Sequence, residues 1–212
     1  GVIKIKGRPP ADYGSRELAL RRAVLAQSVS VAFPFSVAEV VRMGAGERAG
    51  AAVEAMVEEA LSEVDLVDLR DRIVNTLSGG EQQRTHFARV MVQLACGEAR
   101  YGPGLLLLDE PTSSLDLRHQ IDLLSAARRC VSRGVTVVAV LHDLNLAARW
   151  ADDAVIMSHG EVAAYGSVEE ALTPEVITRV YGVEARREVS SNGHFHIFAD
   201  TLHSPVPAGK KS

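Results

Sequence analysis

Apolar and polar residues recur along this chain with periods that change several times, and each period predicts an element. Residues 15–22 have the pattern of a short helix that leads into an apolar strand at 23–27. From 35 to 72 the pattern is helical and acidic, which predicts a small helical subdomain whose first helix begins after Ser36 as its N-cap. Residues 2–7 alternate like a strand.

The middle of the chain predicts a parallel sheet. Apolar residues in 80–95 recur at i, i+3, i+4 and i+7, which marks one buried helix face. Two continuous apolar runs, in 104–110 and 135–141, have the length of strands that are buried on both faces. A helical pattern at 117–133 separates them. Strand, helix and strand in this spacing predict a right-handed crossover between parallel strands.

The remaining residues continue the α/β pattern. We expect a helix at 144–151, alternating segments in 153–166, two short helices in 167–182 and a strand at 194–198. The predicted organisation has four parts: a partial catalytic core at 1–34, a helical subdomain at 35–76, the rest of the core at 77–200 and a disordered tail at 201–212.

Composition narrows the class of protein. Hydrophobic residues make up 47% of the chain and charged residues 24%, which is ordinary for a soluble globular protein. The formal net charge of −4 gives no reason to expect a nucleic-acid partner. The apolar runs are far shorter than the about 20 residues of a membrane span, so any membrane role would be peripheral. Cys96 and Cys130 lack metal-type spacing, and we expect buried free thiols in a reducing compartment.

Two adjacent carboxylates follow the first apolar run, in "LLLLDEPTSSLD" at 105–116. A buried strand delivers them to its carboxyl end, where open α/β sheets bind ligands. This segment resembles the second phosphate-chemistry motif of P-loop ATPases. Asp109 would act on Mg²⁺, directly or through a water, and Glu110 would polarise the attacking water as general base. Strand alternation would turn the two side chains in different directions.

The segment "LSGGEQQR" at 77–84 places a hydroxyl and two glycines before a helix. Such a helix start gathers backbone N–H groups and the positive end of the helix dipole, which together favour an anion. We expect Ser78, Gly79 and Gly80 to face a γ-phosphate while Glu81 and Gln82 begin the helix. The alternative is a plain serine N-cap with glycines in the turn.

Histidines raise two further possibilities. His142 directly follows the apolar run at 135–141, at the same predicted sheet edge as the two carboxylates. A histidine there can donate a hydrogen bond to a γ-phosphate and hold the attacking water. His194 and His196 alternate on one strand near His203, so a metal site is conceivable, although exposed strand histidines are the commoner outcome.

In chain order, Gln27, the two motif segments and His142 resemble the ATP-binding subunits of ABC transporters, from about residue 1 to residue 198. The resemblance implies a P-loop NTPase-like ABC ATPase core, with a parallel sheet and a small helical subdomain. It also implies ATP and Mg²⁺ as ligands and a second copy of the subunit as partner.

Individual roles follow from the resemblance. Gln27 would sense Mg²⁺ or the attacking water, and the segment after it would meet the membrane partner. Leu77, Ser78 and Gln82 would belong to the signature that touches a nucleotide held mainly by the partner subunit. Asp116 would lie in the loop that crosses the dimer interface, and we expect it to serve coupling more than chemistry.

Within that family the chain is most similar to the subunit of bacterial hemin importers, with ferric siderophore and vitamin B12 importers as alternatives. The resemblance implies transmembrane permease subunits as partners, a periplasmic binding protein acting indirectly, and a peripheral location on the cytoplasmic face of the inner membrane. Other interpretations are a soluble ATPase of DNA repair or chromosome organisation and a non-catalytic subunit. The first usually carries long coiled-coil or zinc-bearing insertions that this chain lacks, and the second need not keep Glu110 and His142.

The sequence departs from the family in one respect. It contains no G-x-x-x-x-G-K-[ST], the loop whose lysine and backbone N–H groups hold the phosphates. Its first residue is glycine in a strand-like segment, so we expect the N-terminal portion of the domain to be missing. The loss of a strand would leave backbone groups unpaired. We therefore predict that the chain alone is poorly stable and inactive.

Overall fold

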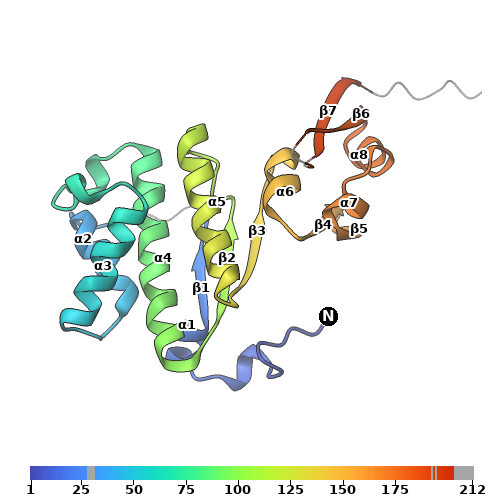
Figure 1. Cartoon of the computed structure of the whole chain (residues 1–212). Coiled ribbons are helices and arrows are strands. Elements are labelled where there is room, and N and C mark those ends of the chain that lie inside the picture. Colours follow the sequence, from blue (N-terminus) through green and yellow to red (C-terminus); the bar gives the residue numbers. More distant parts are fainter. Residues whose placement is uncertain (28–31, 192, 194, 203–212) are drawn as a thin grey trace, which may run out of the picture. The chain divides into compact units, whose positions relative to one another are not determined.

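A computed structural model of the chain describes residues 1–27, 32–191, 193 and 195–202. It divides into two compact units, Gly1–Val140 and Leu141–Ser212 (Figure 1). Of the predicted tail at 201–212, residues 203–212 lie outside the described residues. Among the helices that are described, none is both long enough and apolar enough to cross a membrane.

The described residues of the first unit form three strands and several helices. The strands are β1 (Arg22–Leu25), β2 (Leu105–Asp109) and β3 (Thr136–Val140). The α-helices are α1 (Ser15–Arg21), α2 (Val37–Arg42), α3 (Ala51–Glu63), α4 (Gly79–Tyr101) and α5 (Leu117–Ser132). Four 3₁₀ turns accompany them: η1 (Pro10–Asp12), η2 (Met43–Ala45), η3 (Val67–Leu69) and η4 (Val74–Thr76).

The three strands form one parallel sheet in the order β1-β2-β3 (Figure 1). The predicted strand–helix–strand crossover is confirmed, because α5 connects the parallel strands β2 and β3. Burial on both faces was the wrong expectation for the described residues. Leu106 and Leu108 are buried, but the alternate residues of β2 are only half-buried, and Val138 and Val140 of β3 are 53% and 50% exposed. Helices therefore cover one face of this sheet.

Local sequence explains how the helices begin and pack. Ser36 caps α2 as predicted, and it forms a capping box with Glu39. The helix predicted from residue 80 begins earlier, at Gly79, and is the longest in the described chain. A Cβ on Gly97 of α4 would overlap the carbonyl oxygen of Leu20, so glycine permits the close approach of α1. Both cysteines are free and buried, which confirms that part of the expectation, and burial raises the pKa of each thiol.

The strand expected at 2–7 is absent. Lys6 and Gly7 have φ angles of 47° and 80°, which reverse the chain, so that Ile5 pairs only with Arg8 in an isolated bridge. Alternation of apolar and basic residues resembled a strand, but a turn at Gly7 prevents one from extending.

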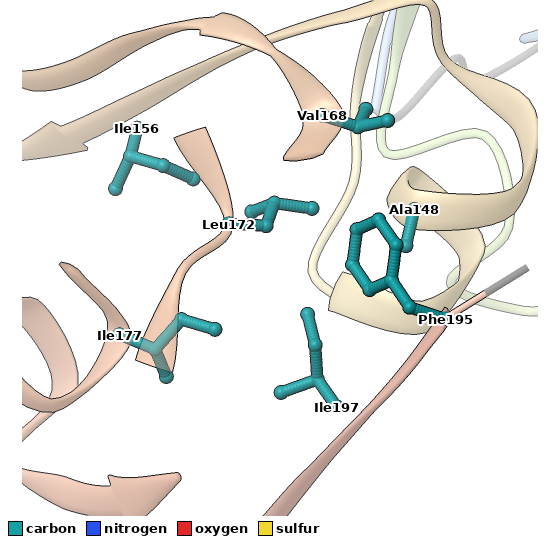
Figure 2. Close-up of a cluster of buried hydrophobic side chains, with 7 residues drawn as sticks. All are labelled: Ala148, Ile156, Val168, Leu172, Ile177, Phe195 and Ile197. Carbon is teal, nitrogen blue, oxygen red and sulfur yellow. The ribbon is translucent and has the colours of Figure 1, made fainter. Parts of the chain in front are cut away.

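In its described residues, the second unit has two antiparallel hairpins and three helices. Its strands are β4 (Asp153–Ser158), β5 (Glu161–Ser167), β6 (Val183–Val189) and β7 (Phe195–Leu202). Its helices are α6 (Leu144–Trp150), α7 (Val168–Ala171) and α8 (Pro174–Tyr181). Figure 2 shows their shared core, in which seven side chains meet: Ala148, Ile156, Val168, Leu172, Ile177, Phe195 and Ile197. The sequence pattern missed β6, whose exposed charged residues hide its alternation.

Candidate functional site

The carboxyl edge of the sheet brings together side chains from two strands. Gln27 lies two residues beyond β1, and Asp109 and Glu110 lie at the end of β2. The Nε2 of Gln27 donates a hydrogen bond to Oε2 of Glu110 over 2.8 Å. An ion or a water is the partner that the family resemblance implies for this amide, and in the structure the amide holds a carboxylate. Such a bond fixes where that carboxylate points.

The backbone of Glu110 is unusual. Its φ is 48°, in the left-handed region that residues with a Cβ rarely adopt. A non-glycine residue held in such a conformation costs about 1–3 kcal/mol and persists only where its surroundings impose it. Here the next turn imposes it, because both the N–H and the Oγ of Ser113 donate to the carbonyl oxygen of Glu110, over 3.3 and 3.1 Å.

Asp109 has different surroundings from Glu110. Its side chain is exposed, and among the described residues it has no hydrogen-bond or ion-pair partner. Carboxylate oxygens are the ligands that Mg²⁺ prefers, and one or two carboxylates plus substrate phosphates usually hold it. An unpaired carboxylate at the ligand-binding edge of the sheet therefore fits a magnesium ion.

The start of α4 is a second part of the candidate site. Ser78 is its N-cap and forms a capping box with Glu81: the Ser78 N–H donates to Glu81 Oε2 over 2.8 Å, and the Glu81 N–H donates to Ser78 Oγ over 3.3 Å. The Ser78 hydroxyl also donates to Glu81, over 2.7 Å. These hydrogen bonds from the Ser78 side chain and backbone lower the pKa of Glu81.

Two N–H donors at this helix start remain open. In the described part of the chain, the N–H groups of Gly79 and Gly80 have no acceptor. As the first residues of α4 they have no acceptor within the helix either. Leu77 and Gln82 are occupied with each other, because Gln82 Nε2 donates to the Leu77 carbonyl over 2.9 Å. This pair of N–H groups without an acceptor is the feature that can bind an anion.

Asp116 lies at the start of α5 and acts as its N-cap. Its Oδ1 accepts from the backbone N–H of His119 over 3.0 Å and contacts His119 Nδ1 over 2.8 Å. Hydrogen bonds from the His119 backbone first, and then from its side chain, lower the pKa of Asp116. The Asp116 carboxylate therefore serves as the N-cap of α5.

Sequence reasoning missed the residues that hold the loop between Glu110 and Asp116. Gln120 of α5 donates from Nε2 to the carbonyls of Thr112 and Leu115, over 3.2 and 3.0 Å. Gln83 of α4 donates to the Pro111 carbonyl over 3.4 Å. No sequence pattern signals a glutamine that bonds backbone carbonyls, so only the structure could identify this pair.

Two histidine predictions stay predictions. His142 follows β3 by two residues and belongs to the second unit, beside the α6 N-cap Asp143. For the suggested metal site, His194 and His203 lie outside the described residues. Within the described ranges, no group of three or more histidines, cysteines or acidic residues could hold a metal ion.

Known proteins resemble this chain over most of its length. A family model described as "ABC transporter" matches residues 1–113. The hemin import ATP-binding protein HmuV of Rhodopseudomonas palustris strain BisA53 is 56% identical over 210 residues, which are 99% of this chain and 78% of that protein. HmuV of Bradyrhizobium diazoefficiens strain USDA 110 is 57% identical over 185 residues, 87% of this chain and 69% of that protein.

A solved structure shares the fold. It is described as a metal-chelate type ABC transporter in an inward-facing conformation, and it matches with a TM-score of 0.70 and 25% identity. The match covers 84% of this chain and 73% of that one.

Proposed function

Because the chain belongs to the ABC transporter family and is an ATP-binding subunit within it, we propose that it couples ATP hydrolysis to the import of hemin. Both relatives described above are named for hemin import, which favours hemin over a ferric siderophore or vitamin B12. The proposed partners are a second ATP-binding subunit and transmembrane permease subunits at the cytoplasmic face of the inner membrane. A periplasmic binding protein would act indirectly, by delivering the cargo to the permease.

Glu110 is the proposed general base. The observation that carries this proposal is its position at the carboxyl end of β2, where the Gln27 amide holds the carboxylate at 2.8 Å. Asp109 would hold Mg²⁺, directly or through a water, and the ion would supply positive charge beside the phosphates. His142 would donate a hydrogen bond to the γ-phosphate and orient the attacking water.

Ser78, Gly79 and Gly80 would serve the nucleotide of the partner subunit. The open N–H groups of the two glycines and the positive end of the α4 dipole suit the γ-phosphate of that nucleotide. Asp116 would lie at the interface between the two subunits and couple their sites. Gln27 would report on the nucleotide through its hydrogen bond to Glu110.

The 212 residues contain no G-x-x-x-x-G-K-[ST] loop to hold a nucleotide of their own. We therefore propose that this chain, by itself, does not turn over ATP. Paired with a family member that contains this loop, it would supply Ser78 and the glycine N–H groups to the nucleotide that the partner holds.

A mixed dimer tests this proposal. The chain is coexpressed and copurified with the BisA53 relative, in which the residue aligned with Ser78 is replaced by arginine. That replacement blocks both sites of the relative's own dimer, so turnover requires the signature of this chain. We expect magnesium-dependent ATP turnover in the mixed dimer and none with either subunit alone. The proposal would be overturned if the mixed dimer turned over ATP no faster than a blank without protein. Robust ATP turnover by this chain alone would overturn it too.

Glu110 needs a separate test, because its own site lacks the phosphate loop. The segment of the BisA53 relative that precedes the aligned region is fused ahead of Gly1 to complete that site. In this fusion we expect Glu110→Gln to retain binding of fluorescent ATP but to lower turnover by about 10²- to 10⁴-fold, the range typical of a general base. Turnover unchanged by the substitution would show that Glu110 is not the base.

The cargo is tested through the permease. The fusion is coexpressed with the permeases of a hemin importer and of a vitamin B12 importer, each with a different affinity tag. Copurification with the hemin permease, and hemin uptake into vesicles that contain the complex, are expected. Selective copurification with the vitamin B12 permease would assign the alternative cargo.

A further inference from the structure

We infer that Gln83 and Gln120 are positioning residues, which hold the loop 110–116 and the start of α4 as one rigid piece. The inference rests on the proposed function, because the loop connects Glu110 with Asp116 and packs beside the helix start that carries Ser78. The pair would fix where Ser78 lies when it meets the partner's nucleotide.

Gln120 makes the stronger of the two connections. Its Nε2 reaches from α5 to two carbonyls of the loop, those of Thr112 and Leu115, over 3.2 and 3.0 Å. Thr112 and Leu115 are only 9% and 8% exposed, so water cannot easily replace these bonds. A buried carbonyl is costly to leave without a donor, which favours the clamped loop over any other shape.

Gln83 holds the same loop from another helix, α4. It is a buried residue of α4, and its Nε2 donates to the carbonyl of Pro111 over 3.4 Å. Glutamine side chains from two helices thus donate hydrogen bonds to backbone carbonyls at three positions of a short loop. Within the loop, Leu115 N–H donates to the Thr112 carbonyl over 3.2 Å, which leaves little freedom between the clamped points.

The clamped loop is in contact with the helix start that carries the signature. A Cβ built on Gly80 would lie 3.0 Å from the Ser114 carbonyl oxygen and 3.7 Å from Leu115 Cδ2. The loop therefore packs directly against the first turn of α4. A displaced loop would displace Gly80, and with it the open N–H groups and Ser78.

The mixed dimer tests the inference, because Ser78 of this chain is the signature on which its turnover depends. Gln120→Ala removes both donors. Gln120→Glu keeps the shape but places carboxylate oxygens against two carbonyls, and Gln120→Lys restores a donor of similar reach. We expect maximal turnover to fall about 10- to 100-fold with alanine, since misplacement by about 1 Å can cost 10²-fold. We expect a larger fall with glutamate and partial recovery with lysine.

Gln93 provides a matched control. It is also a half-buried helical glutamine whose Nε2 donates to two backbone carbonyls, those of Ala19 and Arg22, over 2.6 and 3.4 Å, but it lies away from the loop. Gln93→Ala and Gln93→Glu should lower the melting temperature as much as the Gln120 variants while leaving maximal turnover within about twofold.

The titration of each variant into a fixed amount of the relative separates the outcomes. A lower maximal turnover at an unchanged half-saturating concentration supports positioning. An unchanged maximum with a higher half-saturating concentration would mean that Gln120 serves only folding or dimer formation, and would overturn the inference. Equal losses of maximal turnover in the Gln93 and Gln120 variants would also overturn the inference. If the unsubstituted chain restores no ATP turnover to the relative, the proposed function itself is wrong, and the inference that rests on it falls with it.

Discussion

Two helices of the first unit begin in the same way, yet only one of them is open to a ligand. Ser36 and Glu39 form a capping box at α2, with bonds of 2.7 and 3.3 Å, and Ser78 and Glu81 form one at α4, with bonds of 2.8 and 3.3 Å. In each pair the serine caps the helix, and the glutamate returns to the serine N–H.

The difference lies in the first two N–H groups of each helix. At α2, Val37 and Ala38 donate to the carbonyls of Arg72 and Arg70, over 3.0 and 2.9 Å, and both residues are buried. At α4, the corresponding donors of Gly79 and Gly80 have no acceptor within the described residues. A serine cap therefore does not distinguish a structural helix start from an anion site, whereas the state of the N–H groups that follow it does.

The largest effect should come from Ser78→Asp, compared with Ser36→Asp. Aspartate caps a helix about as well as serine, so both variants should melt within a few degrees of the parent. At Ser78 the new carboxylate would repel the γ-phosphate, and we expect turnover of the mixed dimer to fall about 100-fold or more. Ser36→Asp should leave turnover unchanged. Equal turnover in the two variants would show that the α4 start does not meet the nucleotide.

Gly80→Ala, compared with Ala38→Gly, should have a smaller effect. The new methyl group would lie 3.0 Å from the Ser114 carbonyl and force the loop to shift. Alanine favours a helix by about 1 kcal/mol over glycine, which offsets part of that strain, so we expect little change in melting temperature. Turnover of the mixed dimer should fall about tenfold. Ala38→Gly should lose about 1 kcal/mol of stability without loss of maximal turnover, and the reverse pattern would contradict the comparison.

The sequence was sufficient for features that depend on local patterns. Apolar runs located β2 and β3 and the parallel crossover between them, and the serine before an acidic helix located the Ser36 cap. Patterns failed where the outcome depends on distant contacts. The alternation at 2–7 did not reveal that Gly7 would reverse the chain, and burial on both sheet faces could not be read from apolar runs alone.

The candidate site shows the same division. The position of Glu110 at the strand end followed from the apolar run before it, but its hydrogen bond to Gln27 joins residues far apart in the chain. The clamp by Gln120 is of this kind too, since its partners are backbone carbonyls that any sequence would offer. Motifs therefore located the reactive groups, and only the structure identified what holds them.

The smallest predicted effect concerns acid and the two capping boxes. Hydrogen bonds from Ser36 lower the pKa of Glu39, and those from Ser78 lower the pKa of Glu81, each from an ordinary value of 4.5. A depressed pKa means that each carboxylate stabilises the fold above about pH 4.5, and that this contribution disappears as the pH falls through the lower, folded-state value. Replacement by glutamine keeps a capping box but removes the titrating group.

Glu39→Gln and Glu81→Gln should therefore each reduce, by a similar small amount, the drop in melting temperature of the mixed dimer between pH 6 and pH 3.5, and the double variant should add the two effects. At pH 7 neither should change the melting temperature by more than a degree or two, because glutamine at this position still bonds the serine N–H. Circular dichroism melts at both pH values measure this. If only one of the two variants reduced the acid sensitivity of the melting temperature, the two capping boxes would differ in the protonation of their glutamates as well as in their openness to a ligand.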